Sequence, residues 1–364
     1  MKGKARQANI ELLRIIAMLM VVTLHYLIKG QAAISLEQDT GILNLLLWFL
    51  KAMCIVTINV YVLISGYFLV EAKWKLSRLL TLWLQVMFYS LGVPLVCLAL
   101  GIGEVNTWGV YDWVNVLFPV QMEQYWFITA YVVFYLLVPV LSMGVKKMTR
   151  EQHRFVIVGL LLVFSVPKSL LPIGIPTDRY GYDYGWFVCL FMVASYIRIY
   201  GIPFLNHKKK SFLIYFASVC GIWGISLLCG ILSRKGLSFT YAMNMTYCYN
   251  HILVLVASVA LFCGFQYIKI PQGKIADVIC KVSPYTLGVY LLHENQAIRT
   301  QWQVMAGIEQ VRNGFEIFPH MIITVFAIFI AGVLVDFVRD CIFKVVQRTC
   351  KNVFAGRIAE TEKE

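Results

Sequence analysis

The first apolar stretch of the chain, NIELLRIIAMLMVVTLHYLI (residues 9–28), contains a guanidinium and an imidazole. Histidine exchanges protons near neutral pH, and arginine binds phosphate and carboxylate groups. Arg14 and His25 are eleven residues apart, so on a helix they lie about 20° apart around the axis and roughly 16 Å apart along it. The same face carries Glu11, in i,i+3 reach of Arg14. Ionisable groups are costly in lipid, so we expect this face to point at protein or water. Ionisable groups inside a bilayer are also functional candidates.

A second polar group interrupts the apolar segment SPYTLGVYLLHENQAIRTQW (residues 283–302). If this segment is a span that begins at Ser283, His293 lies near mid-membrane and Glu294 follows it. Polar residues are tolerated at that depth where they line a water-filled space. The alternative is that the helix stops short and His293 lies in an outer loop. For Glu11 and Arg14 the alternative is a snorkelling pair at the interface, and for His25 a hydrogen bond to a neighbouring helix.

Small and basic residues gather where the second apolar segment ends and the third begins. Ser65 and Gly66 lie near the cytoplasmic end of the second segment, and Arg78 follows. A Ser-Gly pair commonly permits close helix packing. Together with Arg14 and Arg78, however, it predicts a cationic pocket that suits a phosphate-bearing ligand.

The composition indicates what kind of fold positions these residues. The chain is 60% hydrophobic and 14% charged, with a mean hydropathy of +0.73, whereas soluble domains carry about 25% charged residues. It therefore reads as an all-α, multi-pass protein of a cell membrane, without room for a large soluble domain. The ten cysteines form no C-x-x-C pair and suggest neither a disulfide framework nor a zinc site.

Apolar runs predict about ten transmembrane helices. They cover residues 10–28, 43–70, 80–101, 125–143, 155–172, 185–200, 212–232, 249–268, 283–303 and 318–338. We expect a membrane domain over residues 9–338 and a basic cytoplasmic tail over 339–364. The first segment also has features of a signal peptide, but its ionisable residues argue against that reading.

Charge predicts the orientation. With a cytoplasmic N-terminus, the cytoplasmic segments hold 23 lysines and arginines and the external loops hold seven. Both termini are therefore expected in the cytoplasm. The same rule explains the net charge of +13 by contact with anionic lipid, without nucleic acid. The external loop of residues 101–124 holds Trp108, Tyr111 and Trp113, either as an interfacial aromatic belt or as a platform for a sugar ring.

In order along the chain, these features resemble the acyltransferase-3 family of integral-membrane O-acyltransferases. The resemblance rests on Arg14 and His25 in the first span, a Ser-Gly-Tyr signature followed by a basic residue, a Trp-Phe segment in the fourth span and a closing Tyr-Leu-Leu-His. Beyond the first pair, the matching residues are Ser65, Gly66, Tyr67, Arg78, Trp126, Phe127, Pro139 and Tyr290–His293. One departure is Tyr125, because many relatives have histidine before the tryptophan.

The resemblance implies transfer of an acyl group, commonly acetyl, from cytoplasmic acyl-CoA to a hydroxyl of a surface polysaccharide or another cell-envelope acceptor. It implies a bacterial cytoplasmic membrane as the location. His25 would be the general base or would carry the acyl group as acyl-imidazole. Arg14 would attract the CoA phosphates or the thioester oxygen, and Ser65, Gly66, Tyr67 and Arg78 would complete the donor site.

On the acceptor side, His293 and Glu294 would orient His25 or bind the acceptor, and Trp126 would stack on sugar. We expect no metal in the site. A partner protein that handles the acyl group remains open, as do the acceptor, the oligomeric state and the choice between direct and relayed transfer.

Two other classes of function also fit charged residues at mid-depth. One is a transporter or flippase for a glycan or an organic anion. Transporters often contain interrupted helices in matching halves, and the sequence suggests an interruption only in the ninth span. The other is a non-catalytic partner in a polysaccharide machine, in which Arg14 and His25 would tolerate substitution.

Overall fold

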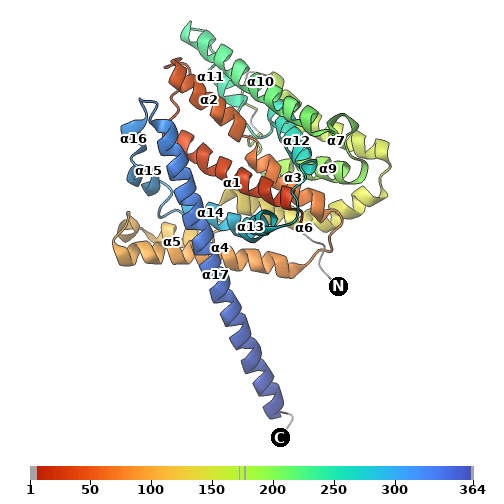
Figure 1. The fold of residues 1–364 in the computed structure, drawn as a ribbon, viewed down its shortest axis with the longest axis vertical. Coiled ribbons are helices and arrows are strands. Elements are labelled where there is room, and N and C mark those ends of the chain that lie inside the picture. Colours follow the sequence, from red (N-terminus) through yellow and green to blue (C-terminus); the bar gives the residue numbers. More distant parts are fainter. Residues whose placement is uncertain (1–5, 172, 176–177, 362–364) are drawn as a thin grey trace.

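The computed structural model describes residues 6–171, 173–175 and 178–361, with side chains as far as residue 349. Every regular element in these residues is a helix, and no strand occurs among them (Figure 1). The predicted all-α fold is therefore confirmed. The nine cysteines whose side chains are described are free thiols.

Seven helical segments of the described chain are long and apolar enough to cross a membrane. They are α1 (Ala8–Ile28), α2 with α3 (Ile42–Leu69), α4 (Leu76–Leu100), α6 (Trp126–Lys147), α10 (Lys208–Arg234), α13 with α14 (Lys274–His293) and the Ile317–Thr349 part of α17. Two shorter apolar helices are α9 (Tyr184–Tyr200) and α12 (Ile252–Gln266). These nine segments overlap nine of the ten predicted spans, as expected of a multi-pass membrane protein.

The predicted fifth span, residues 155–172, is a bent pair of helices. α7 (Arg150–Phe164) and α8 (Val166–Leu170) meet at Ser165, and Pro167 lies in the first turn of α8. Proline is favoured there because it has no backbone N–H to leave unpaired. The count of ten spans and the cytoplasmic location of both termini stay predictions.

The second span is broken, which the sequence did not suggest. α2 (Ile42–Cys54) and α3 (Thr57–Leu69) are separated at Ile55 and Val56. Lys51, near the end of α2, places its ammonium 3.8 Å from the ring centroid of Trp48 and 4.5 Å from that of Tyr247. These cation–π contacts compensate for a lysine within an apolar helix.

The predicted ninth span, residues 283–303, is wrong in its bounds. The span begins at Lys274 with α13 (Lys274–Val282), continues through the 3-10 turn η3 (Ser283–Tyr285) and ends with α14 (Thr286–His293). α13 is amphipathic: Ile275 and Val278 are exposed on one side, while Lys274, Asp277 and Lys281 supply the charges that resembled a loop. His293 is thus the last helical residue of its span, and it is buried.

The last helix, α17 (Ile317–Thr361), continues well past the predicted end at residue 338. Its middle contains a buried polar network, in which Asp336 accepts from Gln85, Tyr89 and Arg339. The Arg339 Nε atom lies 2.7 Å from Asp336 Oδ1, one turn earlier on the same helix. This pairing lets the helix carry two charges across the predicted boundary between membrane domain and tail, a division that stays a prediction.

The helix α1 lies in the middle of the bundle, where it contacts α2, α3, α12, α13, α14 and α17 (Figure 1). One side of α1, with Leu13 and Ala17, packs into the larger core cluster. The other side, with Val22 and Leu27, packs into the cluster formed with α14 and α17. Because α1 is covered on both sides, its polar residues face protein and cavities.

The remaining elements are short and lie in the connections. They are η1 (Val105–Thr107), α5 (Val110–Leu117), η2 (Pro203–Leu205), α11 (Thr240–Met245), α15 (Gln301–Met305) and α16 (Ile308–Val311). In Figure 1, α15 and α16 lie beside the start of α17.

Candidate active site

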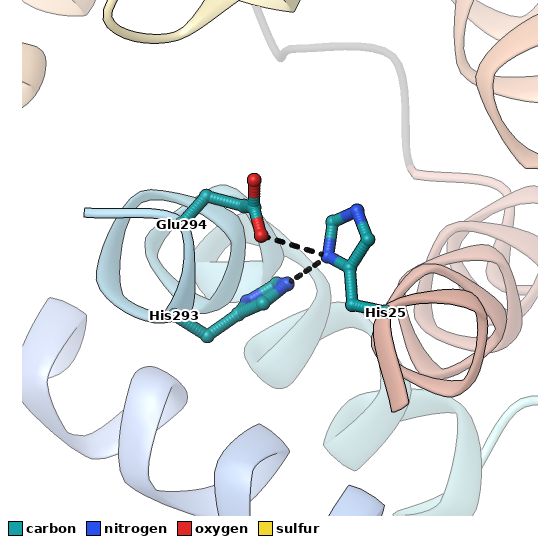
Figure 2. A group of neighbouring side chains, drawn as sticks. All are labelled: His25, His293 and Glu294. Carbon is teal, nitrogen blue, oxygen red and sulfur yellow. Dashed lines mark hydrogen bonds and ion pairs between the residues drawn. The ribbon is translucent and has the colours of Figure 1, made fainter. Parts of the chain in front are cut away.

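His25 of α1 meets the end of α14, where His293 and Glu294 lie (Figure 2). The Nδ1 atom of His25 is 2.8 Å from His293 Nε2 and 3.1 Å from Glu294 Oε1. Both partners are buried, and His25 is partly buried. The structure therefore brings together three predicted site residues from opposite ends of the sequence.

The hydrogen-bond partners define which ring nitrogens carry protons. The Val289 carbonyl can only accept, and it lies 2.5 Å from His293 Nδ1, so that nitrogen donates. In a neutral ring the other nitrogen, His293 Nε2, then accepts, and His25 Nδ1 must be its donor. The Nε2 atom of His25 is left with a free lone pair. In Figure 2 this nitrogen points away from both partners, in position to act as a base.

Lys29 extends the cluster by one helical turn. Its ammonium forms an ion pair with Glu294 Oε2, while the other carboxylate oxygen faces His25. The carboxylate thus bridges an ammonium and an imidazole. In the sequence, Lys29 is one of the seven basic residues of the expected external loops. Its i+4 spacing from His25 was the signal that could have linked the two residues.

The turn after α14 is held by a buried asparagine that the sequence analysis did not single out. Asn295 donates to the Tyr89 carbonyl and to the Tyr125 hydroxyl, both at 2.9 Å, and accepts from the Ala297 N–H at 3.0 Å. The Tyr125 hydroxyl in turn donates to the Leu291 carbonyl at 3.0 Å. Tyr125 is therefore a positioning residue for the turn that carries Glu294. The only signal for this role in the sequence was the hydroxyl of Tyr125 directly before Trp126.

A cavity of about 340 Å³ opens at the Arg14 end of α1, and we call it the inner cavity. Its lining includes Arg14, Ser65 and Arg78, as the sequence predicted, and contains no acidic residue among the described ones. Its other polar lining residues are Tyr61, Tyr131, Tyr135, Ser283, Thr286 and Tyr290. Two guanidinium groups without a lining carboxylate favour an anionic ligand.

The inner cavity extends along α1 and α14 toward the histidine pair. On α1 its lining residues are Arg14, Met18 and Val21, and on α14 they end at Tyr290. Val21 is four residues before His25, and Tyr290 is three before His293, so each lies one helical turn away. A ligand that enters at Arg14 thus approaches His25 along α1, from the N-terminal end of that helix.

Glu11 links α1 to Ser283 beside Arg14. It is buried, accepts a hydrogen bond from the Ser283 hydroxyl and lies 3.6 Å from a guanidinium nitrogen of Arg14. The snorkelling alternative for this pair therefore does not describe Glu11. A neighbouring cavity of about 540 Å³ shares Arg14 with the inner cavity, and its lining adds the cations of Arg6 and Arg198 and the carboxylates of Glu11 and Glu71. We call it the entrance cavity.

Two of the predicted donor-site residues lie on the far side of α3 from the inner cavity. At Gly66 a Cβ atom would approach the Ala194 Cβ to 2.9 Å, so the glycine permits close packing of α3 on α9. The Tyr67 ring packs on Phe262, and the Arg198 guanidinium lies 4.8 Å from its centroid. Tyr67 thus contacts an arginine of the entrance cavity and does not line the inner one.

The aromatic residues that are predicted to contact sugar pack against other side chains, and sugar binding by them stays a prediction. Trp126 lies 4.5 Å from Tyr182 and 6.0 Å from Tyr249 between ring centroids. Trp108 and Trp113 meet edge to face and pack with Ala297. Of the loop aromatics, Tyr111 and Phe118 are exposed. The external loop therefore covers the turn after α14, where Asp112 accepts from the Gln296 amide at 2.8 Å.

The same three groups also have ligand types that metals use. His25, His293 and Glu294 each offer one ligand atom, all within 4.8 Å of one another. Two nitrogen ligands of tetrahedral zinc stand about 3.3 Å apart, given bonds of roughly 2.0–2.1 Å. The observed 2.8 Å between the ring nitrogens is instead the length of a hydrogen bond. The arrangement thus suits a proton-sharing pair of histidines.

Sequence comparison assigns this arrangement to a family. A family described as an acyltransferase domain matches residues 7–338. The chain belongs to the acyltransferase-3 family. No curated protein and no solved structure matches it. The histidine cluster and the inner cavity are accordingly the candidate active site of a membrane acyltransferase, and both lie within the matched residues.

Proposed function

We propose that this acyltransferase moves an acyl group, namely acetyl, from cytoplasmic acyl-CoA to a hydroxyl of an extracytoplasmic glycan or another cell-envelope acceptor. The observation that carries the proposal is the inner cavity, which contains Arg14 and Arg78 at one end and reaches Val21 and Tyr290, one helical turn from the histidine pair, at the other. The phosphates of CoA bind at Arg14, Arg78 and the entrance cavity. The pantetheine arm lies along α1, and the thioester reaches His25.

The chemistry follows from the free nitrogen of His25. Nε2 takes the proton of the acceptor hydroxyl, the oxygen attacks the thioester carbon, and the carbon–sulfur bond breaks. The CoA thiolate leaves and takes up the proton. Glu294 stabilises the positive imidazolium that forms in between. In the relayed variant His25 Nε2 attacks the thioester carbon and expels the CoA thiolate. The acceptor oxygen then attacks the acyl carbon, the bond to Nε2 breaks, and the hydroxyl proton passes to the thiolate.

The length of α1 assigns different roles to its two polar residues. Arg14 begins roughly 16 Å below His25 along the helix. We therefore assign Arg14 to the phosphates of the donor and not to the thioester oxygen. His25 remains the catalytic residue, in a multi-pass protein of a bacterial cytoplasmic membrane. A partner protein would be needed only if the acceptor requires a second transfer.

The test is transfer of radiolabelled acetyl from acetyl-CoA by purified protein in liposomes. We expect His25→Ala to lower the transfer rate by about 10²–10⁴-fold, the usual contribution of a general base. Arg14→Ala should raise the KM for acetyl-CoA. His207→Ala is the matched control, because His207 is exposed at the start of α10. Full activity of His25→Ala would remove the assignment.

Thermal stabilisation separates the alternatives. A donor site for acyl-CoA predicts that CoA raises the Tm of the purified protein, and that Arg14→Ala weakens this effect. A flippase for a glycan predicts no response to CoA. A non-catalytic assembly partner predicts that neither Arg14→Ala nor His25→Ala changes acyl transfer in cells.

A further inference from the structure

A second large cavity lies on the other side of the histidine cluster, and we call it the outer cavity. It encloses about 910 Å³ between the end of α1 and the segment that contains α15 and α16. Lys29 lies in its lining and also pairs with Glu294, so the outer cavity adjoins the cluster directly. Nothing in the proposed donor chemistry uses it.

The outer cavity concentrates positive charge where the chain otherwise has little. The external loops contain seven basic residues, and three of them, Lys29, Arg299 and Arg312, line this cavity. Lys29 is paired with Glu294, and Arg312 has Glu309 at 3.9 Å. Arg299 has no carboxylate partner among the residues that the structure describes. Its guanidinium is thus available to an anion from outside.

A buried amide in the same lining also lacks partners. Gln303 is 7% exposed, and its side-chain nitrogen and oxygen have no hydrogen-bond partner in the described part of the chain. A buried amide without partners costs stability, and a bound ligand or water commonly completes its hydrogen bonds. The cavity lining therefore contains both an unpaired cation, Arg299, and an unsatisfied amide, Gln303.

We propose that the outer cavity binds an acid group, phosphate or carboxylate, of the acyl acceptor, and so selects anionic glycans over neutral ones. This inference rests on the proposed function, because it names the class of acceptor for the same site. Arg299 binds the acid in a two-point contact. Lys29, four residues after His25, places that acid within one or two helical turns of the catalytic ring, and an acceptor hydroxyl then reaches His25 Nε2.

The acid can belong to the glycan itself or to a lipid phosphate that carries the glycan. Both sources present the same chemistry to Arg299, so the probes must separate them. One probe is a soluble glycerol-phosphate oligomer, and a second is a polyisoprenyl-pyrophosphate disaccharide embedded in the nanodisc. The neutral control is a chitooligosaccharide of similar length.

The experiment measures binding of the three probes to full-length protein in nanodiscs, and then acetyl transfer to each. We expect the acidic probes to bind at least tenfold more tightly than the neutral one. The acidic probe that binds more tightly identifies the source of the acid group. Arg299→Gln should raise the Kd and the acceptor KM by roughly tenfold, with the KM for acetyl-CoA unchanged. Arg299→Lys should restore part of the loss. Arg179→Gln is the matched control, because Arg179 is an exposed external arginine outside the cavity.

The outcomes also separate this inference from the proposed function. Equal binding of acidic and neutral probes, or no effect of Arg299→Gln, overturns the inference even if acetyl transfer proceeds. Tight, Arg299-dependent binding of an acidic probe without any acetyl transfer supports the anion site and rejects the proposed reaction. Gln303→Leu should weaken binding of the acidic probe. The Tm should stay at or above that of the wild type, since the substitution removes an unsatisfied buried amide.

Discussion

His25 uses its two ring nitrogens differently, and this division fits the proposed catalysis. Nδ1 is directed at His293, with Glu294 3.1 Å away, and Nε2 is left for the acceptor hydroxyl. The Val289 carbonyl imposes this arrangement through His293. A backbone carbonyl within α14 therefore sets the proton-accepting nitrogen of a side chain on α1.

Glu294→Gln tests the electrostatic part of this arrangement. The amide keeps the shape of the carboxylate but loses the charge that stabilises the imidazolium. Because an interaction with a charged group contributes about 1.5–3 kcal/mol, kcat should fall by roughly 10- to 150-fold, with the KM for acetyl-CoA unchanged. Steady-state kinetics in liposomes check this, with the exposed Glu104→Gln as control. An unchanged kcat would mean that Glu294 acts only as the structural partner of Lys29.

At this scale the sequence singled out the candidate residues but not their contacts. His25, Arg14, His293 and Glu294 follow from their types, spacing and expected depth, and the resemblance suggested their roles, which stay predictions. The 2.8 Å contact between residues 268 positions apart depends on how α1 and α14 pack, which no local pattern encodes. Lys29 and Asn295 were missed because their roles exist only once Glu294 and Tyr125 are in place.

Among the helices, the crossing of α14 and α17 decides where His293 stands. At Gly288 of α14 a Cβ atom would meet Asp336 side-chain atoms at 2.3 Å, and at Gly332 of α17 it would meet the Val289 Cα at 2.5 Å. Small residues let two membrane helices approach closely. The glycines thus bring α14 onto α17 in the turn just before the histidine cluster.

We expect Gly332→Ala to force the two helices apart. An added methyl group that meets backbone in a packed interface costs about 1–3 kcal/mol, so the Tm should fall and kcat should drop because His293 moves with α14. Gly224→Ala in α10 is the matched control, since a Cβ atom there meets nothing within 4 Å, and alanine stabilises a helix interior by roughly 0.5–1 kcal/mol. Equal Tm values for the two variants would contradict a close crossing.

The elements were predicted best where apolar runs are long and worst where charge enters a span. α9 and α10 agree with the expected ranges to within a few residues. The ninth span was misplaced because α13 combines two exposed apolar residues with three charges and so resembles a loop. The break at Ile55 left no signal, because no proline or glycine lies between residues 42 and 65.

The whole molecule has two approaches that converge on one imidazole. The inner cavity leads from Arg14 toward His25, and the outer cavity adjoins the same cluster through Lys29. α1 is the common wall, because its lining residues run from Arg14 to Lys29. With the N-terminus in the cytoplasm, donor and acceptor would reach His25 from opposite sides of the membrane.

This geometry predicts sided transfer in inside-out membrane vesicles. Acetyl-CoA added outside should acetylate an acceptor loaded in the lumen, while the same acceptor added outside should stay unmodified, because only the lumenal side opens onto the outer cavity. Ser65→Trp should fill the inner cavity and raise the KM for acetyl-CoA by roughly tenfold or more. Leu95→Trp, on the exposed side of α4, is the control. Acetylation of the acceptor on the same side as acetyl-CoA would show that the two cavities do not serve opposite faces of the membrane. Loss of lumenal acetylation in Ser65→Trp but not in Leu95→Trp would tie the donor path to the inner cavity.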